Sequence, residues 1–196
     1  MRLFVIKLLY AMCTPIITMS LMASGVKVNG FCYSSGLAFI RRGRGSKMSF
    51  GKKVKMLNLS WMNSVGLNHR CIITTEKYAC LKIGDNVGMS GASIWCFKEI
   101  NIENNVRIGA NTLITDGDAH LDDPRAGEVK PVRICKNVWL GMNVMVLKGV
   151  TIGENTLIGA GSVVTKDIPA NVVAAGNPCK VIKPLNDSLI KQLKEK

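Results

Sequence analysis

The chain has 196 residues, with 47% hydrophobic and 20% charged residues, a composition that excludes an intrinsically disordered protein. This length suits one domain, or one stack of repeats, better than two globular domains. The 26 Lys and Arg against 13 Asp and Glu give a net charge of +13. This charge favours polyanionic partners: phosphorylated cofactors, nucleotide-linked or lipid-linked substrates, or an anionic membrane. Nucleic acid is disfavoured, because no nucleic-acid motif accompanies the charge and aromatic residues are few.

The first segment, residues 1–26, is the most hydrophobic of the chain and carries no charge between Leu8 and Val26. Its length is at the minimum for a transmembrane helix, and Pro15 interrupts it. A signal peptide would fit the basic start and the small residues at 23–25. We favour a third interpretation, a helix that packs on the rest of the protein or lies in a membrane interface.

Residues 27–53 are basic and rich in glycine, as in IRRGRGSKMSFGKK. A solvated linker and an anion-binding surface are equally compatible with this stretch. We therefore predict that residues 1–45 form an apolar and then basic N-terminal segment.

A six-residue repeat governs most of the remaining chain, and this period belongs neither to a helix nor to a simple strand. It is faint at first, clear from Ile83, slips by one residue between Trp95 and Ile102, and runs strongly over residues 134–170. In the strong run the aliphatic positions are Ile134, Leu140, Val146, Ile152, Ile158 and Val164.

Each hexad has the same internal order. The residue after the aliphatic one is often Gly, and the fifth residue is mostly Val, Thr or Ser. Asn stands three positions after the aliphatic residue at Asn86, Asn105, Asn111, Asn137, Asn143 and Asn155. Asn readily adopts positive φ, so we expect each hexad to be a short strand followed by a tight corner. Three hexads per coil would build a triangular prism with the aliphatic side chains inside.

The repeat is interrupted once, by residues 121–133, directly after ITDGDAH. A loop that leaves a rigid repeat is a common place for function. His120 stands at its root, where a stiff element could hold a base within reach of substrate. Asp116 and Asp118 are candidates to orient the imidazole or to bind an acceptor, although both could equally be solvated turn residues. Asp118 falls where other hexads place Val, Thr or Ser, so it is either buried or already outside the coil.

Metal and disulfide chemistry find little support in the sequence. Seven cysteines form no CxxC pair and no zinc-like spacing, which predicts reduced thiols in a cytosolic protein. The chain has two histidines, His69 and His120, so one chain cannot supply a three-histidine zinc site. We expect His69 to be a structural or surface residue and no metal to be required.

The run from Lys130 to Lys183, which ends in GNPCKVIK, closely resembles the hexapeptide-repeat acyltransferases. The similarity is greatest to the sugar O-acetyltransferases of the maltose and galactoside transacetylase type and to polysaccharide O-acetyltransferases, whose histidine motif ITDGDAH resembles. This resemblance implies a left-handed parallel β-helix over residues 46–185 and a homotrimer with active sites between subunits. We also expect a short C-terminal helix at residues 186–196.

The resemblance also implies acetyl-CoA as donor and His120 as the catalytic base. By the same resemblance, Trp139 and Gly141 would lie beside the pantetheine arm, with Ala160 near it. Thr165 and Lys166 would lie toward the nucleotide end, and Lys183 stands where relatives often have Arg. Trp139 could equally just cover the coil edge, and either Lys could be merely solvated. The family's acceptor-binding Asn and Asp are missing from the matching stretch, Ser93 to Glu99.

We therefore expect an enzyme that moves an acetyl group from acetyl-CoA to a sugar hydroxyl, in the cytoplasm or at the inner face of the membrane, during cell-surface polysaccharide biosynthesis. Residues 1–26 would be the segment in peripheral contact with the membrane. Two alternatives are N-acetylation of an amino sugar and a non-catalytic β-helix that binds a polyanion or membrane.

Overall fold

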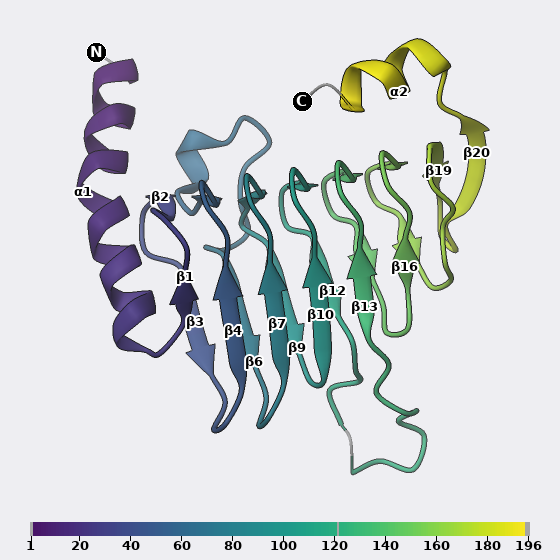
Figure 1. The fold of residues 1–196 in the computed structure, drawn as a ribbon, viewed down its shortest axis with the longest axis horizontal. Coiled ribbons are helices and arrows are strands. Elements are labelled where there is room, and N and C mark those ends of the chain that lie inside the picture. Colours follow the sequence, from purple (N-terminus) through teal and green to yellow (C-terminus); the bar gives the residue numbers. More distant parts are fainter. Residues whose placement is uncertain (1, 121, 195–196) are drawn as a thin grey trace.

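The computed structural model describes residues 2–120 and 122–194. Residue 121, the first of the predicted loop, and residues 195–196, the end of the predicted C-terminal helix, lie outside the described residues. The strands form three parallel sheets that close into a triangular prism, the predicted left-handed parallel β-helix (Figure 1). We call the sheets A, B and C, and the chain visits them in that order, one strand from each per coil.

Each sheet stacks corresponding strands of successive coils. Sheet A contains β1 (Lys27–Val28), β4 (Lys47–Phe50), β7 (Cys80–Ile83), β10 (Glu99–Ile102), β13 (Val132–Ile134) and β16 (Thr151–Ile152). Sheet B contains β2 (Tyr33–Ser35), β5 (Lys55–Leu57), β8 (Gly88–Ser90), β11 (Arg107–Ile108), β14 (Trp139–Leu140), β17 (Leu157–Ile158), β19 (Val172–Ala175) and the antiparallel β20 (Lys180–Pro184). Sheet C contains β3 (Phe39–Arg42), β6 (Ile72–Thr75), β9 (Ser93–Cys96), β12 (Leu113–Thr115), β15 (Met145–Val146) and β18 (Val163–Val164).

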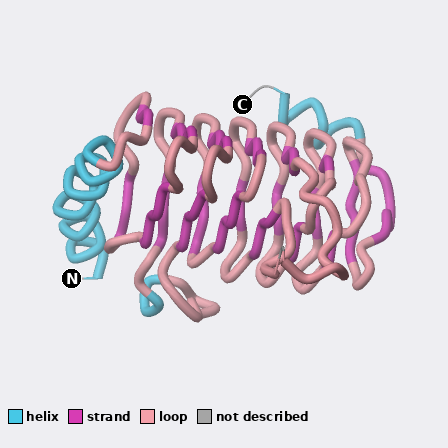
Figure 2. Tube along the Cα trace, turned by 90° about the horizontal axis from the view of Figure 1, so that it is seen from below, coloured by secondary structure: helices cyan, strands magenta, loops and turns pink. Residues whose placement is uncertain are grey.

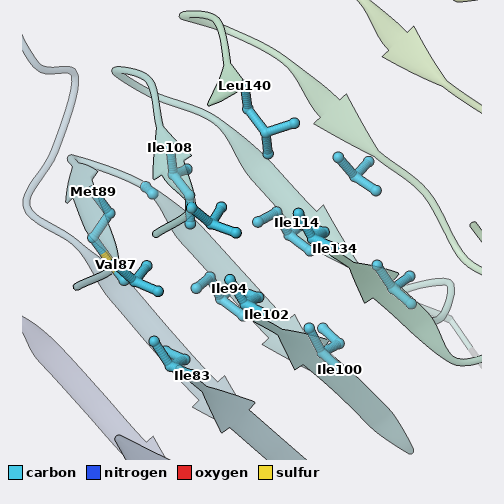
Figure 3. Packing of buried hydrophobic residues seen from close by; sticks show 14 of the residues in the cluster. Ile83, Val87, Met89, Ile94, Ile100, Ile102, Ile108, Ile114, Ile134 and Leu140 are labelled. Carbon is cyan, nitrogen blue, oxygen red and sulfur yellow. The ribbon is translucent and has the colours of Figure 1, made fainter. Parts of the chain in front are cut away.

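The hexad aliphatic residues fill the interior of the prism, as predicted. Ile102, Ile134 and Ile152 stack in register along sheet A, and all three are fully buried. Figure 3 shows the same inward stacking for Ile108 and Leu140 on sheet B. Such burial contributes roughly 1.5–3 kcal/mol per large aliphatic side chain, so the repeat itself stabilises the fold. At the slip in the period, Ile94 points inward and Trp95 lies on the outer side of β9.

The six predicted Asn corners all have positive φ, between 54° and 61°. The structure adds a feature that the spacing did not predict. At the edge between sheets A and B, the side-chain amides form a ladder in which each Nδ2 donates to the Oδ1 of the next coil. The ladder runs through Asn86, Asn105, Asn137, Asn155 and Asn171, with donor–acceptor distances of 2.7–3.1 Å.

The coils begin earlier than the predicted boundary at residue 46, because β1, β2 and β3 already pair in parallel with the next coil. The aliphatic signature of this first coil is weak, because Val28 and Ile40 keep the six-residue spacing while Ser34 stands between them in register with Met56. Between β5 and β6 the chain leaves the coil for a loop with a short 3-10 helix, η1 (Ser60–Met62), which interrupts the hexads in the region where the repeat is faint.

Helix α1 (Arg2–Ala23) closes the N-terminal end of the prism (Figures 1 and 2). Ile17 and Leu21 are buried in the hydrophobic core. The hydroxyls of Thr18 and Thr14 accept hydrogen bonds from the backbone N–H groups of Cys32 (3.1 Å) and Ser34 (3.4 Å). Helix α1 therefore satisfies edge-strand donors that would otherwise remain open to pairing. Its length and composition would also suffice to cross a bilayer over Ile6–Ala23, and 22% of that window is buried in the protein.

The C-terminal end is closed by the β19–β20 hairpin, after which helix α2 (Asp187–Lys194) returns along the prism (Figure 1). The side chain of Asn137 donates to the backbone carbonyl of Leu193 at 3.2 Å, which ties α2 to the Asn ladder. The helix thereby roofs part of the outer face of sheet B, where its leucines line a groove.

Candidate active site

His120 lies in the loop that connects β12 to β13, at the edge where sheet C turns into sheet A. The loop projects from the prism below β13 in Figure 1. The side chain of His120 is exposed, and its backbone carbonyl accepts a hydrogen bond from the N–H of Asp123 at 3.1 Å. This histidine is therefore open to solvent and to any molecule that approaches the edge.

Asp116 anchors the start of this loop. Its buried carboxylate accepts hydrogen bonds from the backbone N–H groups of Phe97 (2.6 Å), Lys98 (2.8 Å) and Glu99 (2.6 Å) on the preceding coil. Its backbone carbonyl accepts from the N–H of Lys130, at the end of the loop, at 3.0 Å. The three backbone donors give Asp116 a structural role at the coil corner, and among the described residues the structure has no hydrogen bond between Asp116 and His120.

Asp118 anchors the loop to the following coil. The chain has left the coil at this point, and the half-exposed carboxylate accepts hydrogen bonds from the Lys148 ammonium and from the N–H of Gly127 at 3.0 Å. The hydrogen bond from Lys148, followed by that from Gly127, holds the pKa of Asp118 below its usual value. Asp116 thus fixes the His120 loop to the preceding coil, and Asp118 fixes it to the following coil. The sequence alone did not predict this role for Lys148, because a single Lys at a coil corner has no distinctive sequence pattern.

The residues expected to contact the cofactor lie on several parts of the prism. Trp139 is 51% exposed on the outer face of sheet B. Gly141 and Ala160 follow β14 and β17, at the edge between sheets B and C. A Cβ on Gly141 would lie 2.6 Å from the backbone N of Ala160, so close coil stacking alone requires glycine there. Lys183 is exposed on β20, paired with Val173.

Thr165 and Lys166 are exposed and follow β18. They lie on the edge between sheets C and A that also carries His120, two coils further along. In a triangular prism this edge is opposite the face formed by sheet B. Within one chain, His120 and Trp139 therefore cannot line the same cleft. Apart from the buried Asp116, the predicted site residues lie on the surface, and they are distributed over different faces and edges of the prism.

His69 lies in the loop between β5 and β6, and its Nδ1 is 2.7 Å from the backbone carbonyl of Arg70. The ring is partly exposed. Among residues 2–120 and 122–194, the structure has no cluster of three or more His, Cys, Asp or Glu that could hold a metal ion.

Comparison with known proteins agrees with this architecture. Residues 131–166 match the family model described as bacterial transferase hexapeptide (six repeats). The chain is 49% identical over 92 residues to galactoside O-acetyltransferase of Escherichia coli strain K12, an alignment that covers 45% of this chain and 45% of the relative. It is 50% identical over 95 residues to galactoside O-acetyltransferase of Lactococcus lactis, covering 46% and 45%. The matched region therefore spans about half the length of these curated relatives.

Two solved structures extend the comparison beyond the matched sequence. One is a hexapeptide-repeat-containing acetyltransferase of Vibrio cholerae in complex with acetyl coenzyme A, at a TM-score of 0.52 and 30% identity over 58% of this chain and 64% of that one. The other is an N-acyltransferase of Bacillus cereus, at a TM-score of 0.66 and 16% identity over 90% and 94%, which supports the fold alone. These comparisons show that residues 131–166 carry the repeat of the bacterial transferase hexapeptide family, and the coil geometry extends the same β-helical fold along the chain.

Proposed function

We propose that the protein is a CoA-dependent O-acetyltransferase that moves an acetyl group from acetyl-CoA to a sugar hydroxyl in cell-surface polysaccharide biosynthesis. The observation that carries this proposal is the placement of His120, an exposed imidazole on a loop anchored to a rigid prism by Asp116 and Asp118. The relatives named galactoside O-acetyltransferase and the acetyl-CoA complex of the Vibrio cholerae protein support the reaction class.

In the proposed mechanism, His120 accepts the proton of the sugar hydroxyl while the hydroxyl oxygen attacks the thioester carbonyl. Backbone N–H groups of a coil stabilise the oxyanion of the tetrahedral intermediate. The intermediate collapses with cleavage of the carbon–sulfur bond, and His120 returns the proton to the departing CoA sulfur. This sequence requires neither a covalent enzyme intermediate nor a metal ion.

We propose further that the enzyme acts as a homotrimer with its active sites between subunits. The support is geometric, because His120 and Trp139 occupy an edge and the opposite face of the same prism. A neighbouring subunit would bring its Trp139 face toward the loop of the first one. In that arrangement Gly141, Ala160, Thr165, Lys166 and Lys183 would line the CoA arm, with the two lysines complementing its phosphates.

The direct test is incubation of the purified protein with acetyl-CoA and a panel of sugars, nucleotide sugars and lipid-linked oligosaccharides, with release of free CoA thiol as the readout. We expect thiol release that depends on the presence of one class of acceptor. Absence of acceptor-dependent release across the panel would contradict the proposed function and would favour a non-catalytic β-helix.

We propose peripheral contact with the membrane through α1, at the cytoplasmic face. The side of α1 that faces away from the prism exposes an apolar stripe, composed of Leu8, Met12, Ile16, Met19 and Met22, which are 48–69% exposed. Exposed Lys7 and Lys27 flank this stripe and would face anionic headgroups. The seven free cysteines suit a reducing compartment such as the cytoplasm.

We expect the protein to cosediment with phosphatidylglycerol vesicles better than with phosphatidylcholine vesicles, and less well as salt is added. The double substitution Ile16→Glu and Met19→Glu should weaken this binding by at least about tenfold, because it places charge in the apolar stripe. Val65→Glu is the matched control, since Val65 is an exposed apolar residue in the loop between β5 and β6. Equal binding by both variants would exclude α1 as the contact surface.

A further inference from the structure

One row of residues crosses the outer face of sheet B in register, through β5, β8, β11, β14 and β17. The row consists of Lys55, Gly88, Arg107, Trp139 and Leu157. Along the prism axis, the side chains of the row are cationic on the N-terminal coils (Lys55, Arg107) and aromatic or aliphatic on the C-terminal coils (Trp139, Leu157). The same five residues line a groove of about 890 Å³, which is closed by Tyr10 of α1 at one end and roofed by leucines of α2 at the other.

Gly88 makes a hollow in this row. An added Cβ at Gly88 would meet no atom within 4 Å, in contrast to corner glycines such as Gly84 and Gly109, whose Cβ atoms would collide with the next coil. Neighbouring strands lie about 4.8 Å apart, so the backbones of Lys55 and Arg107 are separated by roughly 10 Å across Gly88. Two long cationic side chains therefore flank an open space of the size of a phosphate or diphosphate group.

Neither cation is neutralised by its own chain within the part that the structure describes. Other cations on the coils do have carboxylate partners, such as Arg133 with Glu103 and Lys136 with Glu154. Lys55 and Arg107 are exposed and form no ion pair with a carboxylate among the described residues. The planar guanidinium of an Arg suits bidentate hydrogen bonding to a phosphate, and Lys adds a point charge.

We infer that this groove binds the phosphate-bearing part of the acceptor, so that the acetylated sugar carries a phosphate or diphosphate substituent. This inference rests on the proposed acetyltransferase function and deepens it. Arg107 and Lys55 would hold the phosphate across Gly88, and the neighbouring Trp139 would place the sugar toward His120 of the adjacent subunit. The CoA phosphates would lie further along the same row, toward Lys183, and against Lys166 on the edge of the adjacent subunit that also carries its His120, so the two anionic groups do not compete.

The test compares three acceptors: a uridine-diphosphate hexose, a polyprenyl-diphosphate hexose and the neutral methyl galactoside. Arg107→Gln and Lys55→Gln should each raise KM for a diphosphate acceptor by about 10- to 100-fold, the effect of losing one charge-assisted hydrogen bond. KM for acetyl-CoA should stay unchanged. Lys47→Gln is the matched control, because Lys47 is an exposed Lys at the start of β4 on sheet A.

Gly88→Val provides a second variant that removes no charge. The added side chain enters open space and no positive φ forbids it, so the variant should fold with unchanged or higher stability while it blocks the hollow. Calorimetric titration with each diphosphate acceptor, without acetyl-CoA, should show binding to the parent protein and its loss in Gly88→Val. Whichever diphosphate acceptor binds identifies the source of the phosphate.

The outcomes separate this inference from the proposed function. The inference would be overturned if the neutral sugar were turned over as fast as, or faster than, both diphosphate acceptors and if Arg107→Gln and Gly88→Val had the kinetic constants of the parent protein. The proposed acetyltransferase function would then still stand. Diphosphate binding that is lost in Gly88→Val, in a protein that releases no thiol with any acceptor, would support the groove and contradict the proposed reaction.

Discussion

Replacement of His120 by alanine is expected to lower kcat by about 10²- to 10⁴-fold, the usual contribution of a positioned general base. The sugar hydroxyl would then have to lose its proton to water as it attacks the thioester. His120 is exposed on the loop between β12 and β13, so its removal leaves no buried cavity and should not unfold the coils. Steady-state thiol release, together with calorimetric titration of CoA, measures the two effects separately.

His69→Ala is the matched control for this experiment, since it removes the other imidazole of the chain. The His69 ring lies in the loop between β5 and β6, away from the edge that carries His120. We expect the His69 variant to keep the parent kcat and the His120 variant to keep the parent affinity for CoA. A kcat of His120→Ala close to that of the parent protein would contradict the assignment of His120 as the general base.

Replacement of Asp116 by alanine should lower the free energy of unfolding by about 3 kcal/mol or more. The fully buried carboxylate accepts three backbone hydrogen bonds at the corner after β9, and alanine would leave those donors without an acceptor. An unsatisfied buried donor costs about 1–3 kcal/mol, although water that enters the vacated space would recover part of this loss. Urea unfolding followed by far-UV circular dichroism gives the difference.

Asp118→Ala is the corresponding control for stability. Its carboxylate is partly exposed and holds the loop rather than a coil corner, so we expect a much smaller change in unfolding free energy than for Asp116→Ala. Equal stability losses for the two substitutions would show that Asp116 does not close the corner. The pair thus separates a residue that builds the coil from one that restrains the His120 loop.

Much of the fold is predictable because each coil repeats a local pattern. Burial of Ile134 and Leu140 and positive φ at Asn137 follow from the order of residues within one hexad. The first coil was missed because Ser34 breaks the aliphatic series between Val28 and Ile40, and Ser34 and Cys32 pair instead with hydroxyls of α1 at the end of the prism. No local pattern contains that information, since the covering helix comes from a different part of the chain.

The site was harder to predict than the fold, and Asp116 shows why. Its partners are backbone N–H groups 17 to 19 residues earlier, which become neighbours only when two coils stack. Gly88 and Arg107 looked like ordinary hexad residues until register aligned them with Trp139 across the outer face of sheet B. The place of His120 in a loop outside the coils was predictable, because the interruption of the repeat marks that loop in the sequence, while its role as the base stays a prediction.

The central claim is acetyl transfer from acetyl-CoA to a sugar hydroxyl. Mass spectrometry of the acceptor after incubation with the enzyme and acetyl-CoA tests it most directly. The account predicts the gain of one acetyl group, its removal by mild alkali as expected for an ester, and its absence in reactions with His120→Ala. An acetyl group that survives alkali would show transfer to an amine, and an unmodified acceptor beside hydrolysed acetyl-CoA would contradict transfer to a sugar.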